Sequence, residues 1–315
     1  MTLDFSRTAA GCQGPVNISR STAIASCYVA LKHVFPDVPA NAGVLEPIDF
    51  VIAPGSLLAA CAPKPVGGYT ETILRIIDLV FVALSKACPQ RVNGCAYGTI
   101  NALSIAGHRA DASRWVMFSF FGGGHGGHPE GDGLSHSNAP ISMATIPPLE
   151  ILEAAYPVRF TQWSLREDSG GAGRNRGGLG AVYEIELLEE QGTGFLFGER
   201  GRYPPPGVLG GGPGALNRFT FEGDDGFVTP PMTSKMVDID LSRGKRVRLE
   251  TPGGGGYGPP VEREPDRVAE DVRLGYVSRA AAHADYTVVL DAAGAVDVEA
   301  TARLRAQLAA IGPPA

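Results

Sequence analysis

A glycine-rich stretch at residues 168–178 carries the residue types from which an anion-binding site can be built. It contains an acid, a hydroxyl and two arginines, and six glycines fall between residues 170 and 180. Glycine is costly to order, so this density indicates positive φ angles or a backbone that approaches something closely. Consecutive amides of a glycine-rich turn can cradle an anion, and arginine adds a fork that fits carboxylate or phosphate. The alternative is a tight surface loop whose arginines are solvated.

A second glycine cluster, Gly122–Gly133, follows a predicted strand and formally contains the dinucleotide-binding pattern GxGxxG. That pattern requires a helix to begin at the loop, and the proline and glycines that follow exclude one. The same region offers metal-ligand residue types, namely His125, His128, Glu130, Asp132 and His136. Because a glycine-rich loop imposes no coordination geometry on them, we expect ordinary hydrogen bonds rather than a metal site. Ser169 lies outside a Gly-x-Ser-x-Gly elbow, so we expect no nucleophilic serine.

The composition predicts a globular, cytoplasmic protein. The chain has 315 residues, of which 44% are hydrophobic and 19% charged, and its net charge is −6. It has no run rich in lysine and arginine, which argues against nucleic acid or an anionic membrane as a partner. Five cysteines without a CxxC pair, and an N-terminus without a secretion signal, indicate reduced thiols. The longest apolar stretch is interrupted by Arg75 and Asp78 and is too short to span a bilayer.

The apolar patterns predict a mixed α/β fold in which glycine-rich loops join mixed sheets, with a β-rich second half and a helical C-terminus. We expect helices at residues 21–34, 70–87, 149–155, 266–274, 278–283 and 298–310. We expect strands at residues 50–52, 115–121, 159–166, 181–188, 195–197, 218–221, 246–249 and 287–290. The apolar strand 115–121 is predicted to be buried on both faces. Residues 1–265 are expected to form a core on which a helical segment, residues 266–315, packs.

Two further observations limit the chemistry of the chain. It lacks the GxxxxGK[ST] loop, so it is not expected to hold ATP through a P-loop. On the helix predicted at residues 70–87, Glu71 and Arg75 lie four residues apart, where they could pair with each other rather than serve a site.

Taken together, the glycine clusters resemble the hydantoinase B/oxoprolinase family, which includes the corresponding subunits of acetone and acetophenone carboxylases. The resemblance covers nearly the whole chain in the right order, and its motif at residues 168–178 is specific. The residues that carry it are Pro15–Asn17, Pro54–Ser56, Glu71, Thr72, Arg75, Gly122–Gly133, Asn138, Pro148, Glu150, Glu153, Asp168–Gly178, Glu199, Arg200, Gly210–Gly214, Thr251–Gly258, Asp271–Gly275, Thr301, Leu304 and Arg305.

The resemblance implies ATP-dependent chemistry in a complex. Family members act with a hydantoinase A-like partner that binds ATP, and a carbonyl oxygen is phosphorylated before a cyclic amide is hydrolysed or a ketone is carboxylated. ATP with Mg and a divalent metal are therefore expected on partner subunits, and no cofactor on this chain alone. The family's N-terminal metal-binding pattern, Asn-Asp-Pro…Gly-Gly-x-His-x-x-Asp with a His-His pair, is missing here. We therefore expect a separate chain to supply the N-terminal half of the B subunit; the alternative is that this chain has lost the metal site and is not catalytic alone.

Two hypotheses follow from the resemblance. In the first, the chain is part of an enzyme that hydrolyses a hydantoin, a lactam or a 5-oxoproline-like ring, or part of a carboxylase, and is inactive alone. Its predicted substrate-binding residues are Arg174, Arg176, Ser169, Gly170, Gly171, Asn138 and Arg75. Its predicted catalytic residues are Asp132 and His125, which would carry protons in one pocket, and Asp168, which would orient the arginines. In the second, the chain is a non-catalytic scaffold whose glycine loops join other subunits.

Overall fold

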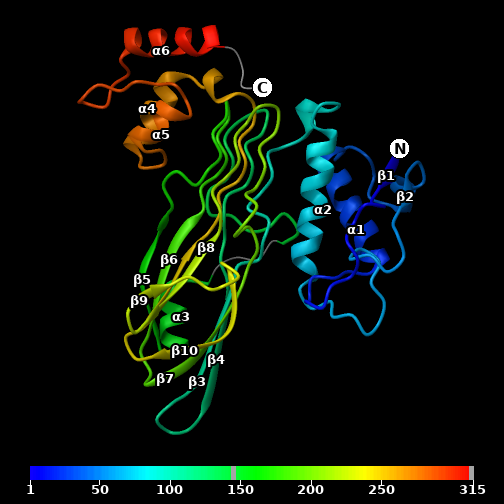
Figure 1. Ribbon diagram of the computed structural model, residues 1–315, viewed down its shortest axis with the longest axis vertical. Helices are drawn as coiled ribbons and strands as arrows, with labels where there is room; N and C mark the ends of the chain where they lie inside the picture. Colours follow the sequence, from blue (N-terminus) through cyan, green and yellow to red (C-terminus); the bar gives the residue numbers. More distant parts are fainter. Residues whose placement is uncertain (143–146, 312–315) are drawn as a thin grey trace.

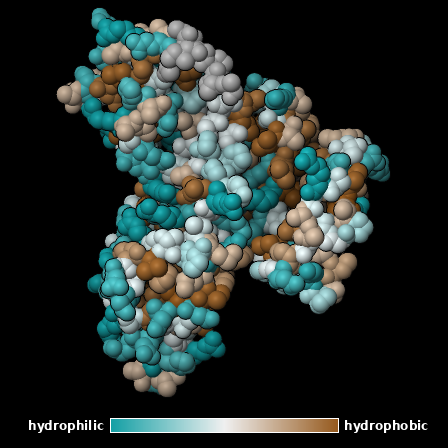
Figure 2. Space-filling model, in the orientation of Figure 1, coloured by the Kyte–Doolittle hydropathy of each residue, from teal (hydrophilic) through white to brown (hydrophobic). Residues whose placement is uncertain are grey.

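The computed structural model describes residues 1–142 and 147–311. Figure 1 shows three lobes around a narrow middle, with the sheets below, the C-terminal helices above and the N-terminal helices on the right. The N-terminal lobe contains α1 (Arg20–Val34), α2 (Tyr69–Leu84), β1 (Thr2–Asp4) and β2 (Asp49–Val51). The two helices pack against each other and carry their own apolar clusters. In Figure 2 a notch separates this lobe from the sheets. Both helices were predicted, and the second ends earlier, at Leu84.

Two antiparallel sheets form the lower lobe. One has the strand order β10-β7-β3-β4 and consists of β3 (Ala102–His108), β4 (Arg114–Phe120), β7 (Gln191–Phe197) and β10 (Lys235–Ser242). The other has the order β5-β6-β11-β8-β9 and consists of β5 (Val158–Leu165), β6 (Ala181–Leu187), β8 (Arg218–Gly223), β9 (Gly226–Val228) and β11 (Arg246–Glu250). A short helix, α3 (Leu149–Ala155), lies against β5. Inward-facing residues of both sheets share one apolar cluster, so the sheets pack face to face.

The structure corrects the prediction that the strand at 115–121 is buried on both faces. β4 is an edge strand whose residues alternate, with Trp115 and Met117 in the core and Val116, Phe118 and Phe120 exposed. An unbroken apolar run therefore does not prove two buried faces. The outer phenylalanines line a groove together with aromatic residues of β7.

The C-terminal lobe confirms the predicted helical end of the chain. It contains α4 (Pro265–Arg273), α5 (Arg279–Ala284) and α6 (Val298–Ile311). Its small apolar cluster also packs against Ala172 of the central glycine stretch. The strand expected at residues 287–290 is wrong, because this segment forms only an isolated bridge between Leu290 and Val296. The mixed α/β class is confirmed, and the division at residue 265 stays a prediction.

Candidate functional site

The glycine-rich segments lie side by side in one bundle that joins the three lobes. In Figure 1 they run as extended ribbons between the sheets and the C-terminal helices. The segment at residues 251–258 is bonded to several neighbours at once: Gly254 N donates to Gly178 O, Gly255 N to Cys95 O, Gly256 N to Gly212 O and Tyr257 N to Asn175 O, at distances of 2.8 to 2.9 Å. The first three amides thus bond to three different segments. The fourth, that of Tyr257, bonds again to the segment that contains Gly178. That repeat is expected of extended chains with about three residues per turn.

Close approach of backbones explains the glycines of this bundle. A Cβ atom built on Gly254 would lie 2.0 Å from the carbonyl oxygen of His125, and one built on Gly178 would lie 2.0 Å from that of Leu134. Neither glycine has a left-handed backbone. Of the two reasons that the sequence offered, close approach therefore applies here, and what is approached is another segment of the same chain.

The predicted anion-binding amides are largely engaged inside the bundle. Gly171 N donates to Gly254 O at 2.8 Å, and Arg176 N donates to Oδ1 of Asp132 at 2.6 Å. Ser169 is buried, donates its hydroxyl to Arg166 O and accepts a hydrogen bond from Gly180 N at 2.9 Å. The alternative of a solvated surface loop is therefore excluded for most of residues 168–178.

The charged residues of the glycine clusters face the C-terminal lobe, where they are paired. Arg263, which is 1% exposed, binds both oxygens of Asp132 at 2.7 and 2.8 Å and also binds Asp271 at 2.7 Å. Arg176 is buried and donates to the same Asp271 at 3.3 Å. Burial would raise the pKa of Asp132, but hydrogen bonds and charge from Arg263 outweigh it, so the pKa is lowered. Asp132 is therefore an ionised partner of arginines here.

Three further predicted site residues, Asp168, Arg174 and Arg75, also have partners within the chain. Asp168 is exposed and accepts a hydrogen bond from Ser278 N at 2.7 Å, at the start of α5. Arg174 lies 3.6 Å from Glu262 and over the ring of Tyr257.

Arg75 pairs with Asp78 at 2.9 Å and with Gly98 O, rather than with Glu71, so the expected pair four residues apart is wrong. The buried Glu71 instead accepts a hydrogen bond from Ile100 N at 3.0 Å. The predicted roles of Asp168, Arg174 and Arg75 in binding or catalysis stay predictions.

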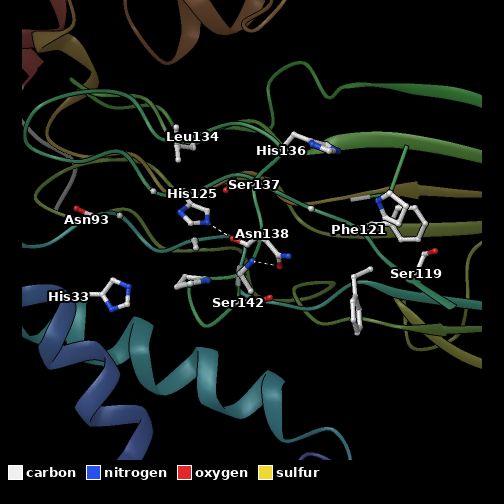
Figure 3. Close-up of a pocket in the computed structure, with 18 of the residues that line it drawn as sticks. His33, Asn93, Ser119, Phe121, His125, Leu134, His136, Ser137, Asn138 and Ser142 are labelled. Carbon is white, nitrogen blue, oxygen red and sulfur yellow. Dashed lines mark hydrogen bonds between the residues drawn. The ribbon is translucent and has the colours of Figure 1, made fainter. Parts of the chain in front are cut away.

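A cavity of about 1010 Å³ lies on the other side of the bundle. Four of the six histidines of the chain line it, and Figure 3 shows His33 of α1 facing His125 and Asn138 across the open space. The wall is otherwise made of aromatic, aliphatic and small polar residues. Among the lining residues that the structure describes there is no aspartate, glutamate, lysine or arginine. His125 and Asn138 are therefore the predicted site residues that reach this cavity.

His125 presents a proton acceptor to this cavity. Its Nε2 is bonded to the backbone carbonyl of Asn138, and a carbonyl can only accept, so the ring proton sits on Nε2. The lone pair of the neutral ring is then on Nδ1, for which the described residues provide no hydrogen-bond partner. Burial lowers the pKa of His125 and outweighs the hydrogen bond to Asn138 O, which would raise it, and the proximity of His33 also lowers it. A neutral imidazole with its Nδ1 lone pair available is the form that acts as a general base.

His136 is held in the opposite tautomer. The indole Nε1 of Trp163 donates to its Nε2 at 3.0 Å, and the hydroxyl of Tyr183 bonds to the same atom. An indole N–H can only donate, so Nε2 carries the lone pair and Nδ1 carries the proton. Burial lowers the pKa of His136. Two imidazoles of the cavity are thus neutral near pH 7, one fixed by its surroundings and one offering a base.

Sequence reasoning missed the contribution of His33 and Asn93 to this cavity. His33 lies near the end of α1, where its Nδ1 bonds to Val29 O at 2.9 Å, and nothing local marks it as more than a helical histidine. Within residues 1–142 and 147–311, no three metal-ligating side chains are grouped so that they could hold an ion. The same residues contain no helix long and apolar enough to cross a membrane.

Comparison with known proteins gives consistent matches. The model of the hydantoinase B/oxoprolinase family matches residues 1–260. A protein of Methanocaldococcus jannaschii is 34% identical over 308 residues, which cover 96% of this chain and 53% of that protein. Caprolactamase subunit beta of Pseudomonas jessenii is 32% identical over 305 residues, 92% of this chain and 52% of that subunit. The chain thus spans about half the length of these two relatives.

Solved structures share the fold. The ATP-dependent caprolactamase of Pseudomonas jessenii superposes with a TM-score of 0.80 at 29% identity, over 95% of this chain and 53% of that chain. Nucleotide-free acetone carboxylase superposes with a TM-score of 0.85 at 24% identity, over 99% of this chain and 48% of that chain. The second likeness shows the fold alone.

Proposed function

Because this chain belongs to the hydantoinase B/oxoprolinase family, we propose that it is a subunit of an ATP-dependent complex that hydrolyses a cyclic amide. The observation that carries the proposal is the histidine-lined cavity beside the glycine bundle, inside the region that the family model matches. The likeness to an ATP-dependent caprolactamase supports hydrolysis. The likeness to acetone carboxylase supports the fold only, so carboxylation is the less supported reaction.

We assign ATP with Mg, and a divalent metal, to partner subunits. The chain has no P-loop, and its described residues offer no grouped metal ligands. The ATP-binding partner would be a hydantoinase A-like subunit. The chain matches about half of the hydantoinase and caprolactamase subunits, and the proposed complex would also need the part of the B subunit that this match leaves out.

In this proposal His125 is the general base. Once the carbonyl oxygen of the ring is activated by phosphorylation, water adds to the carbonyl carbon and passes a proton to Nδ1 of His125. The carbon–nitrogen bond then breaks, the ring nitrogen leaves with a proton, and the ring opens to an acyl phosphate. A second water hydrolyses this acyl phosphate to a carboxylate and inorganic phosphate. The bond from Nε2 to Asn138 O holds the imidazole in the tautomer that this step needs. The imidazolium formed in this way returns its proton to solvent or to the leaving nitrogen.

The test is ATP-dependent ring opening by the complex assembled from co-expressed subunits, with a panel of cyclic amides and with ketones plus bicarbonate. His125→Gln should lower turnover about 100-fold, in line with the loss of a general base. The matched control is His108→Gln, because His108 is exposed on β3 and lies outside the cavity.

Native mass spectrometry of both variants should show intact assembly. Full turnover by His125→Gln would contradict the assigned role. Turnover of ketones with bicarbonate, but of no cyclic amide, would replace hydrolysis by carboxylation. If no substitution in this cavity changes the rate per assembled complex, the chain would instead be a non-catalytic scaffold.

A further inference from the structure

We infer that the histidine-lined cavity takes an uncharged ring, a cyclic amide without a carboxylate, and discriminates against its carboxylated analogue. The inference rests on the proposed function and narrows its substrate class. Hydantoins and simple lactams belong to the favoured class, whereas 5-oxoproline carries a carboxylate and does not.

The first support is that the described residues of the wall include no aspartate, glutamate, lysine or arginine. No lysine or arginine lies among the described lining residues, so a carboxylate entering the cavity would find no ammonium or guanidinium partner. The arginines of the nearby glycine clusters are turned to the other side, where Arg176 and Arg263 are paired with Asp132 and Asp271. Removing a carboxylate from water without such a partner is strongly unfavourable.

The second support is the protonation of the histidines. Burial lowers the pKa of two cavity histidines, His125 and His136, and a hydrogen bond at Nε2 fixes the tautomer of each. Neither therefore supplies a positive charge near neutral pH. The only N–H that His125 has in this form is already donated to Asn138 O.

The third support is the fit to a neutral amide. Nδ1 of His125 is an acceptor without a partner among the described residues, and it suits the N–H of a ring or a water molecule. The side-chain amide of Asn93 lines the cavity, makes no hydrogen bond within the described residues and can donate to a ring carbonyl. Aromatic and aliphatic side chains of the wall suit ring methylenes, namely Phe81, Phe118, Phe120, Phe121, Leu152 and Tyr156.

A matched pair of substrates tests this inference. 2-Pyrrolidinone and 5-oxoproline share one ring and differ only in the carboxylate. With the assembled complex and ATP, kcat/KM should be at least about 100-fold higher for 2-pyrrolidinone. Equal or faster opening of 5-oxoproline would overturn the inference, while the proposed hydrolase function would stand.

If the complex opens neither of these two rings, the wider panel of cyclic amides still judges the proposed function, and binding decides the inference. Ligand-observed NMR on the complex without ATP measures how the same two rings bind. Binding of 2-pyrrolidinone without 5-oxoproline supports the inference. Stronger binding of 5-oxoproline, or binding of neither ring, overturns it.

A cation placed in the wall should shift the preference. Leu134 lines the cavity and is 66% exposed, so its side chain can be replaced without loss of core packing. Leu134→Arg should raise kcat/KM, or binding, for 5-oxoproline about 10-fold relative to the uncharged control Leu134→Gln. Equal ratios in the two variants would contradict the view that a missing cation sets the preference.

Discussion

The two sides of the glycine bundle differ in charge, although the same glycine-rich segments supply both. On the side of the C-terminal lobe, Asp132, Arg176, Arg263 and Asp271 form a buried network in which the opposite charges are paired. On the cavity side, the titratable groups among the described lining residues are four histidines and Tyr156, and burial lowers the pKa of two of the histidines. His125 and Asp132 belong to one glycine cluster but lie on opposite sides of this division.

The difference separates assembly of the fold from chemistry. A buried ion pair holds two segments in register but leaves no charge to offer to a substrate. A neutral imidazole with a lone pair in an open cavity can accept a proton. The predictions below test whether the bundle, the charged side and the neutral side can be changed separately.

Disrupting the bundle itself should have the largest effect, because both sides depend on it. Gly254→Ala places a methyl group 2.0 Å from the carbonyl oxygen of His125, and backbone on both sides must move. We expect the free energy of unfolding to fall by about 3 kcal/mol or more. The matched control is Gly212→Ala in the same bundle, where the nearest atom lies 3.4 Å away. Urea unfolding of both variants measures the difference, and equal stabilities would refute the close-packing argument.

Removing an ion pair on the side of the C-terminal lobe should lower the free energy of unfolding without changing the substrate preference. Asp132→Asn removes the charge that faces Arg263, a side chain that is 1% exposed. We expect a loss of about 3 kcal/mol in the free energy of unfolding, since a buried guanidinium loses one of its two carboxylate partners. The ratio of kcat/KM for the neutral and carboxylated rings should stay the same. A changed ratio would place Asp132 in the site, as the sequence predicted. Glu270→Gln, which breaks the exposed pair with Arg273, should leave the stability unchanged.

The same pair predicts a pH dependence. The pKa of Asp132 in the folded chain is below the ordinary value of 3.8, so its ionised form is favoured by folding. Its contribution is fully present above that ordinary value and is lost as the pH falls toward the folded pKa. The stability difference between the wild type and Asp132→Asn should therefore shrink in this acidic range. Urea unfolding at a series of pH values measures it, and a constant difference would argue against the ion pair.

Local patterns predicted the regular elements where their signals were strong. The helical period of residues 70–87 and the short helix at 149–155 are confirmed. β3 was not predicted, because its alanine, serine, glycine and histidine give little strand signal, and its place in the sheet comes from pairing with β4 and β7. Tertiary context likewise determines the burial of β4. Its sequence is an apolar run, but only alternate residues face the core.

The site was harder to predict than the fold. Glycine density showed that something must approach the backbone, but an anion and another segment of chain require the same residue. Only the assembled bundle shows that Gly254 approaches the carbonyl of His125. The cavity also combines α1 with loops far along the chain, so the position of His33 in sequence gave no indication that it faces His125.

The smallest expected effect is the change in stability that comes from the protonation of His125, on the cavity side of the bundle. Because burial lowers the pKa of His125 below its ordinary value of 6.5, the ring should stay neutral at pH 6.5, with its proton on Nε2. Folding disfavours the charged form, so the free energy of unfolding should decrease as the pH falls from 6.5 through the folded pKa. Nitrogen NMR of the labelled chain, with the His125→Gln variant to assign the signal, reports both the pKa and the tautomer. A proton on Nδ1, or a pKa at or above 6.5, would remove the base from the cavity and with it the contrast between the two sides.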